Sequence, residues 1–195
     1  MRILKLTTAA ALALAAAACG GQDADNQLTT DANLAEDIDT NEMLGDANQT
    51  APSATPTDAA GFAAAVAASD LYEIESSALA ASKARSAELK SHAEHIGADH
   101  RKSSADLKAA AASANVTVTP QLDAEKQAML DQLKAASDAD FDRLFVEQQR
   151  TAHQKALQLL QTYAASGDNA ELKAFAGKAV PIVQGHLETL NGLKL

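Results

Sequence analysis

The chain has 195 residues and a formal net charge of −10, and 47% of its residues are hydrophobic, yet it contains no Trp, two Tyr and four Phe. This length suits one domain with extensions, and the shortage of aromatic and β-branched residues favours an all-α fold with a core of small and aliphatic side chains. An acidic chain with so few aromatic residues lacks the basic groove and stacking surfaces of nucleic-acid-binding proteins, so we expect no nucleic-acid partner.

Residues 1–19 have the organisation of an export signal. Arg2 and Lys5 precede an uncharged Ala/Leu run that ends in small residues at Cys19, the only cysteine of the chain. The run is too short for a membrane-spanning helix. Its end resembles a bacterial lipoprotein signal, which implies that Cys19 is acylated and holds the protein on a membrane. Because Gly20 follows Cys19, the resemblance favours the outer membrane, facing the periplasm. The alternative is an ordinary secretory peptide cleaved among the alanines, which would leave a free thiol.

The segment 20–57 differs in composition from the rest of the chain. It contains eight acidic residues and no Lys or Arg, it ends in TAPSATPT, and it has no sustained apolar period. This composition predicts a disordered acidic tether. As a flexible chain, its 38 residues would span on the order of 35 Å. We therefore expect the folded domain to occupy 58–195 and to stand away from the membrane surface.

The region 58–195 is predicted to form a four-helix bundle with one short crossover helix. The first long helix is predicted over 58–84 with Asp58 as its N-cap, and the second over 86–114 with Ser86 as its N-cap. The segment NVTVTPQ interrupts the helical pattern, and a shorter helix is predicted after it over 119–136, where Pro suits the first turn.

Two more long helices complete the predicted bundle. One is expected from Ser137 or Asp138 to Ser166, and the other from a capping box of Asp168 and Glu171 to the C-terminus. Helices of some 25 residues are about 37 Å long, which is typical of four-helix bundles.

Three of the five histidines lie in the segment HAEHIGADHRK, residues 92–102. Successive rotations of 100° place His100 in line with the apolar stripe of its helix, His92 at the edge of that stripe, and His95 outside it. We expect His95 to form an exposed pair with Asp99 one helical turn later. On this projection the three histidines do not form a site by themselves.

The same projection places one polar side chain near the apolar stripe of each long helix. These side chains are Glu73, His100, His153 and His186, of which His153 lies furthest from its stripe. Counting from the interhelical turns puts Glu73 and His100 at one level and separates His153 from His186 by roughly 7 Å.

Three interpretations of these four side chains are open. They could form a buried Glu–His hydrogen-bonded network that needs no metal. They could hold one first-row transition-metal ion through nitrogen and oxygen donors. They could also be scattered and partly solvated.

Several segments resemble a known family over about 62–190. The most specific of them are Asp99-His100, Phe141-Asp142 followed by His153, and Pro181 followed by His186. They resemble domain-of-unknown-function family 4142, a group of exported bacterial proteins. The resemblance implies a ferritin-like helical bundle and a location in the cell envelope, and it implies no activity.

The residues give no support for catalysis. Di-iron bundles use Glu three residues before a metal-binding His, but the positions three residues before the five histidines hold Leu89, His92, Gly97, Arg150 and Val183. Cys19 is assigned to the anchor, and the chain has no phosphate-binding glycine loop. We therefore expect a protein that is not an enzyme.

The sequence leads to one preferred function and two alternatives. We expect a lipid-anchored helical bundle that faces the periplasm and acts as a binding or envelope stress-related module, with an unidentified protein or small-molecule partner. The first alternative is a mononuclear metal-binding protein that uses the inward His and Glu side chains. The second is a pH sensor, in which protonation of His100 or His186 loosens the bundle.

Overall fold

The computed structural model describes residues 55–194. The predicted signal, Cys19 and nearly all of the acidic tether lie outside the described residues. The described part contains five helices and no strand: α1 Ala59–Lys83, α2 Ala87–Ser113, α3 Ala124–Ala135, α4 Phe141–Ser166 and α5 Ala170–Gly192. None of these helices is long and apolar enough to span a membrane. The predicted all-α fold is confirmed.

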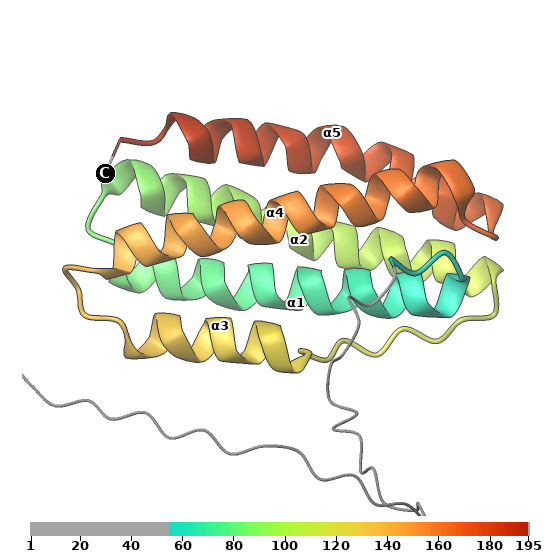
Figure 1. The fold of residues 1–195 in the computed structure, drawn as a ribbon, viewed down its shortest axis with the longest axis horizontal. Coiled ribbons are helices and arrows are strands. Elements are labelled where there is room, and N and C mark those ends of the chain that lie inside the picture. The colour runs from blue at the N-terminus through green and yellow to red at the C-terminus, as the bar shows by residue number, and fades with distance from the viewer. Residues whose placement is uncertain (1–54, 195) are drawn as a thin grey trace, which may run out of the picture. The chain divides into compact units, whose positions relative to one another are not determined.

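The four long helices lie side by side, and the short α3 packs against α1 (Figure 1). The α1–α2 and α3–α4 connections lie at one end of the bundle, and the α2–α3 and α4–α5 connections lie at the other (Figure 1). Because α3 returns the chain to the end where α2 begins, α2 and α4 start together and run parallel. The structure thus contains the predicted bundle with a short crossover helix.

Local capping explains where the first two helices begin and end. The Asp58 carboxylate accepts a hydrogen bond from the Gly61 N–H at 2.8 Å, and Ser86 Oγ accepts one from the Leu89 N–H at 3.2 Å. Both caps satisfy N–H groups that the first helical turn leaves free, as predicted. At the end of α2, Asn115 adopts a left-handed conformation with φ of 55°, which a short polar side chain tolerates.

The other three helices begin later than the sequence pattern predicts. Helix α3 starts after Asp123, whose side chain accepts from the Lys126 N–H, because the preceding link is extended and packs Val116 and Val118 onto the core. Helix α4 starts four residues after Ser137, which instead forms a turn. The cap of α5 is Asn169 and not the predicted Asp168.

Side chains also tie the connections to neighbouring helices. The Asp142 carboxylate, in the first turn of α4, accepts hydrogen bonds from the backbone N–H groups of Arg85 and Ser86 at 3.0 Å. This fixes the α1–α2 connection against the start of α4. The Lys83 ammonium donates to three carbonyls at the end of α3, where the helix dipole favours a positive charge.

The core is divided into two apolar clusters. At the end where α1 begins, Phe62 stacks on Tyr163 with ring centroids 3.8 Å apart. At the opposite end, Phe141 and Phe145 are fully buried beside Leu190. Each cluster draws residues from all four long helices, so each end of the bundle has its own hydrophobic core.

A layer of buried polar side chains separates these two clusters. Its members are Asp70, Glu73, Ser76, Ser77, His92, His100, Gln148, Gln149, His153 and His186. Burial of polar groups is unfavourable unless they find partners. This buried polar layer is therefore the candidate functional region of the bundle.

Candidate metal centre

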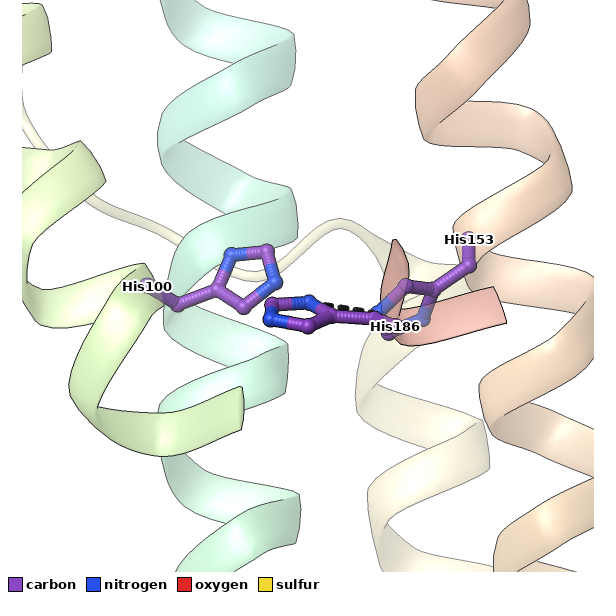
Figure 2. A group of neighbouring side chains, drawn as sticks. All are labelled: His100, His153 and His186. Atoms are coloured by element: carbon purple, nitrogen blue, oxygen red, sulfur yellow. Dashed lines mark hydrogen bonds between the residues drawn. The ribbon is translucent and has the colours of Figure 1, made fainter. Parts of the chain in front are cut away.

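All five histidines of the chain gather around His186, which α5 places in the polar layer. The ring centroids of the other four lie between 5.4 and 6.1 Å from that of His186. Three of the rings, from α2, α4 and α5, are drawn in Figure 2. The three histidines of the 92–102 segment thus belong to one cluster, which the single-helix projection did not reveal.

His100 is oriented by an aspartate on the neighbouring helix. Its Nδ1 lies 2.7 Å from Asp70 Oδ1, and Ser104 Oγ donates to the other oxygen of that carboxylate. A carboxylate accepts only, so the ring proton of neutral His100 is on Nδ1 and the lone pair is on Nε2. His100 Nε2 is buried and has no hydrogen-bond partner.

His153 is oriented by the backbone of its own helix. Its Nδ1 lies 2.9 Å from the Gln149 carbonyl oxygen, one helical turn earlier. A carbonyl oxygen also only accepts, so Nδ1 carries the proton and the lone pair is on Nε2. That Nε2 lies 3.3 Å from His186 Nδ1.

His186 is oriented by Asp99 of α2. Its Nε2 lies 2.9 Å from Asp99 Oδ2, so neutral His186 carries its proton on Nε2 and its lone pair on Nδ1. The contact between His153 and His186 that is dashed in Figure 2 therefore joins two lone pairs in the neutral rings. A cation between the two nitrogens would convert this repulsion into attraction.

The three imidazoles form a group of donors that could hold a metal ion. His100, His153 and His186 each offer one ring nitrogen, and the three nitrogens lie within 4.8 Å of one another. Two nitrogens bound to zinc at about 2.0–2.1 Å with a tetrahedral angle are about 3.3–3.4 Å apart. The 3.3 Å separation between His153 and His186 matches this value.

Each of these imidazoles also has the outer partner that metal-binding histidines usually have. Asp70, Asp99 and the Gln149 carbonyl each accept from the ring nitrogen that faces away from the group. Such partners fix the tautomer and the ring orientation and make the inner nitrogen more basic.

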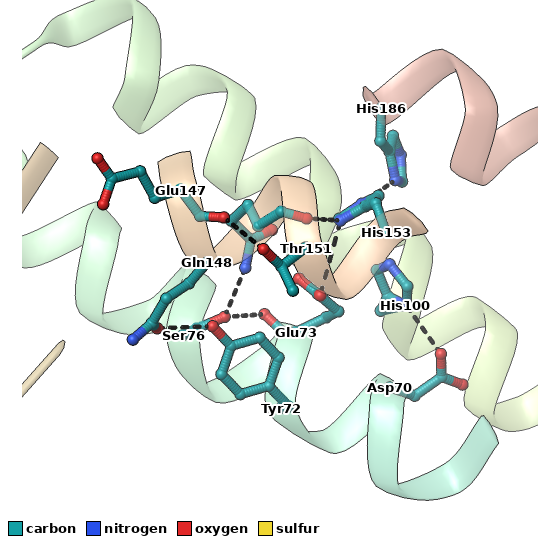
Figure 3. A network of polar contacts seen from close by, with 11 residues as sticks. Asp70, Tyr72, Glu73, Ser76, His100, Glu147, Gln148, Thr151, His153 and His186 are labelled. Carbon is teal, nitrogen blue, oxygen red and sulfur yellow. Dashed lines mark hydrogen bonds and ion pairs between the residues drawn. The ribbon is translucent and has the colours of Figure 1, made fainter. Parts of the chain in front are cut away.

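Glu73, the fourth predicted ligand, lies outside this group of three. Its Oε1 is 3.7 Å from His153 Nδ1, the nitrogen that already donates to Gln149, and its Oε2 is buried without a partner. Figure 3 shows Glu73 on the side of His153 away from His186, toward Ser76 and Gln148. Burial raises the pKa of Glu73 to about 7, partly offset by His100. Glu73 therefore lies beside His153 Nδ1, the nitrogen that faces away from the group, and is not one of the three potential metal ligands.

Burial and the neighbouring carboxylates together set the pKa values of the buried histidines. Desolvation, with repulsion from His100 and His186, lowers the pKa of His153 to about 3. Desolvation also lowers the pKa of His186, although the bond to Asp99 opposes the shift. For His100, desolvation lowers the pKa, but the bond to Asp70 and the charge of Glu73 outweigh it, so the pKa of His100 is raised. His153 and His186 are thus neutral near pH 7.

A cleft connects the group with solvent. It has a volume of about 520 Å³, runs between α2 and α5, and is lined by Asp99, His100 and His186 at one end and by apolar side chains such as Phe175 and Ile182. A metal ion held by three histidines has a further coordination position, and the cleft lies beside two of the three.

The predicted separation of His153 and His186 along the bundle axis is wrong. The sequence count separates His153 from His186 by roughly 7 Å, but their facing nitrogens are 3.3 Å apart. His153 precedes the end of α4 at Ser166 by 13 residues, and His186 follows the start of α5 at Ala170 by 16. Side chains lean toward the N-terminus of their own helix. In antiparallel helices this moves His153 away from the connection and His186 toward it, which closes the remaining gap.

The predictions for the other histidines are partly confirmed. His100 is buried as expected, and His95 is exposed and lies 3.4 Å from Asp99. His92, expected at the edge of the apolar stripe, is buried.

Sequence reasoning missed the two aspartates that orient the site. Asp70 lies within about 60° of Glu73 on the helical projection, a signal that could have placed it on the inward face. Asp99 was assigned only to His95, whereas it also accepts from His186. Its position directly before His100 gives no indication of a partner on α5.

The fold and the site define an all-α helical bundle whose polar layer brings three imidazole donors together. The chain belongs to the family described as a domain of unknown function (DUF4142), whose sequence model matches residues 44–193. It is also similar to the crystal structure of a DUF305 fragment from Deinococcus radiodurans, with a TM-score of 0.61 and 15% sequence identity over 69% of this chain and 93% of that chain. This similarity shows the fold alone. No curated protein matches the chain.

Proposed function

We propose that this protein binds one first-row transition-metal ion through His100, His153 and His186, in a domain that Cys19 tethers to the periplasmic face of the outer membrane. The observation that carries the proposal is the convergence of three imidazole nitrogens whose opposite ring nitrogens all donate to fixed oxygen acceptors. The metal-binding alternative of the sequence analysis is therefore preferred, with Asp70 and Asp99 as supports and Glu73 moved to a supporting role.

A buried hydrogen-bonded network without metal explains this geometry less well. Such a network would place a donor opposite each acceptor. Here the neutral forms of His153 and His186 turn lone pairs toward each other at 3.3 Å, and His100 Nε2 is buried with no partner. With all three rings neutral, one cation would satisfy all three nitrogens at once, and its binding would release the proton that the raised pKa of His100 favours.

The donor set indicates the class of ion. Imidazole nitrogens suit zinc, copper, nickel and iron, whereas magnesium and calcium prefer oxygen ligands. Three protein ligands leave a position for water or a small molecule, which could reach it through the cleft. We propose binding or buffering of the ion as the function, without catalysis.

The envelope location rests on the N-terminal sequence. Arg2 and Lys5, the Ala/Leu run and Cys19 followed by Gly20 support export and lipid attachment. The acidic composition of residues 20–57 supports a spacer between the anchor and the bundle.

Metal titration of the chain without residues 1–19 tests the proposed function. We expect one Zn²⁺ or Co²⁺ ion per chain, with the absorption spectrum of low-coordinate nitrogen-bound cobalt. His153→Gln and His186→Gln should each weaken binding at least roughly 100-fold, because each removes a direct ligand. His95→Gln is the matched control, since it removes an imidazole outside the inner group, and its affinity should not change. Wild-type protein that binds no stoichiometric ion, and whose melting is unaffected by chelator, would refute the proposal.

A further inference from the structure

A second group of metal-ligating side chains lies on the solvent side of the inner group. It consists of His95, Asp99 and His186, and one ligand atom from each lies within 4.8 Å of the others. We propose that this group is a capture site, which takes the metal ion from solution and passes it to the inner donors through the His186 ring. This inference rests on the proposed function, because it assumes that the inner group is the final site.

The capture site spans the distance from solvent to the buried layer. His95 Nε2 lies 3.4 Å from Asp99 Oδ2, and the same oxygen lies 2.9 Å from His186 Nε2. The exposed fractions of the three side chains fall from 65% for His95 to 31% for Asp99 and 4% for His186. The first ligand is therefore freely reached by a hydrated ion, and the last is shared with the inner group.

His186 presents a different nitrogen to each group. Its Nε2 faces Asp99, and its Nδ1 faces His153 at 3.3 Å. A neutral imidazole has one lone pair and one N–H. The ring can thus serve the capture site or the inner group, and occupancy of one excludes the other unless the ring loses its one N–H proton and becomes imidazolate.

The two tautomers of His186 suit the two positions of the ion. With the ion at the capture site, Nε2 is a ligand and the proton is on Nδ1, from which it can be donated to His153 Nε2. With the ion at the inner group, Nδ1 is the ligand: it gives its proton to solvent, Nε2 takes a proton from solvent in the cleft, and Asp99 accepts from that N–H. The His186 ring carries one N–H proton with the ion at the capture site and one with the ion at the inner group. Transfer of the ion therefore causes no net change in the protonation of the ring.

A further nitrogen lies beside this route. His92 Nε2 is buried without a hydrogen-bond partner, and the His92 ring centroid is 6.1 Å from that of His186. No hydrogen bond within the described bundle accounts for this atom.

A capture site affects rates and leaves the equilibrium unchanged, and this separates it from a final ligand. The chain without residues 1–19 is mixed with Co²⁺ or Zn²⁺ in a stopped-flow instrument, and release is followed after addition of chelator. For His95→Gln we expect association and dissociation both to slow by the same factor, roughly tenfold or more, because the ion is no longer concentrated beside the shared ring. The dissociation constant and the stoichiometry of one ion should remain as in the wild type.

Glu94→Gln controls for general electrostatic attraction, because Glu94 is an exposed residue of α2 next to His95. Its rates should change less than about threefold, since screening weakens attraction between exposed charges. Unchanged rates in His95→Gln would mean that ions reach the inner group without first binding at His95, and this would overturn the capture site alone. Equal slowing in both variants, or a weaker equilibrium affinity in His95→Gln, would also overturn it. Tight binding that survives His153→Gln would refute the proposed function instead.

Discussion

The substitution Asp70→Asn tests whether the partner of His100 acts on a metal. Asp70 is buried, accepts from His100 Nδ1 at 2.7 Å, and accepts from Ser104 Oγ at 3.2 Å. Asn has nearly the same shape. Its carbonyl can accept from His100, and its amide can donate to the Ser104 hydroxyl, so every hydrogen bond keeps a partner. The variant therefore removes the negative charge and leaves the packing in place.

The size of the effect follows from the position of the charge. A carboxylate behind a ligating imidazole increases the basicity of the metal-facing nitrogen, and loss of such a partner typically weakens metal binding by about 10–100-fold. This corresponds to about 1.4–2.7 kcal/mol of binding free energy. Removal of one of three imidazoles should cost more, so Asp70→Asn is expected to fall between the wild type and His153→Gln.

The assay is competition between the protein and a chelator of known affinity, with circular dichroism as the test of folding. Asp106→Asn is the matched control, because Asp106 is 54% exposed, lies on α2, and pairs within residues 55–194 only with Lys102. It changes the net charge equally, and its affinity should stay within about threefold, since exposed pairs contribute little. Equal affinities of Asp70→Asn and the wild type, in a folded variant, would refute the reasoning that His100 is a ligand oriented by Asp70.

Three further predictions concern the stability of the bundle. Gly167→Ala should destabilise it by about 1–3 kcal/mol in urea unfolding, because the new Cβ would lie 2.5 Å from the buried Tyr163 ring. Asp142→Ala should cost about 1–3 kcal/mol, because the backbone N–H groups of the α1–α2 connection lose their acceptor. Asp123→Ala should cost about 1 kcal/mol at pH 7 through loss of the α3 cap. Burial raises the pKa of Asp123, but the bonds from Lys126 outweigh this and leave the pKa lowered. The contribution of ionised Asp123 to the free energy of unfolding is therefore complete at a pH above the ordinary carboxyl pKa. It disappears as the pH falls through the lowered pKa of the folded state.

Each of these three stability predictions has its own control variant and its own result that would contradict it. Gly177→Ala meets no atom within 4 Å and should stabilise α5 by roughly 0.5–1 kcal/mol; destabilisation by both glycine variants would contradict the steric argument. Asp138→Ala removes an exposed acid from the α3–α4 turn and should be neutral, so an equal loss in Asp142→Ala and Asp138→Ala would point to charge alone. For Asp123→Ala, a loss of stability that grows as the pH falls from 7 to 3 would contradict the predicted direction of the pH dependence.

The sequence predicted those parts of the fold that depend on neighbouring residues. Asp58 and Ser86 cap their helices as expected because a cap needs only a short polar side chain and the next turn of backbone. The start of α5 was misplaced by one residue because Asp168 has another partner: Tyr163 Oη donates to its carboxylate at 2.8 Å. Such a contact depends on tertiary structure and leaves no mark on local propensity.

The sequence predicts which side chains of the candidate site face inward, but it does not predict which of them contact one another. Helical periodicity places Glu73, His100, His153 and His186 on inner faces, and all four are buried. Periodicity on one helix carries no information about rotation and height relative to another helix. For this reason, no pattern in the sequence indicates that Asp99 meets His186, or that Glu73 lies on the side of His153 away from His186.

The candidate site takes its three imidazoles from α2, α4 and α5 and the partner of His100 from α1. No fragment of the chain that lacks a long helix contains all of it. A molecule whose last helix has come away from the bundle keeps two imidazoles at most. Its apparent affinity would fall in proportion to the fraction of molecules in which that helix is docked. Metal affinity would thus report on the completeness of the tertiary structure, and a truncated or partly degraded copy of the bundle would release a bound ion.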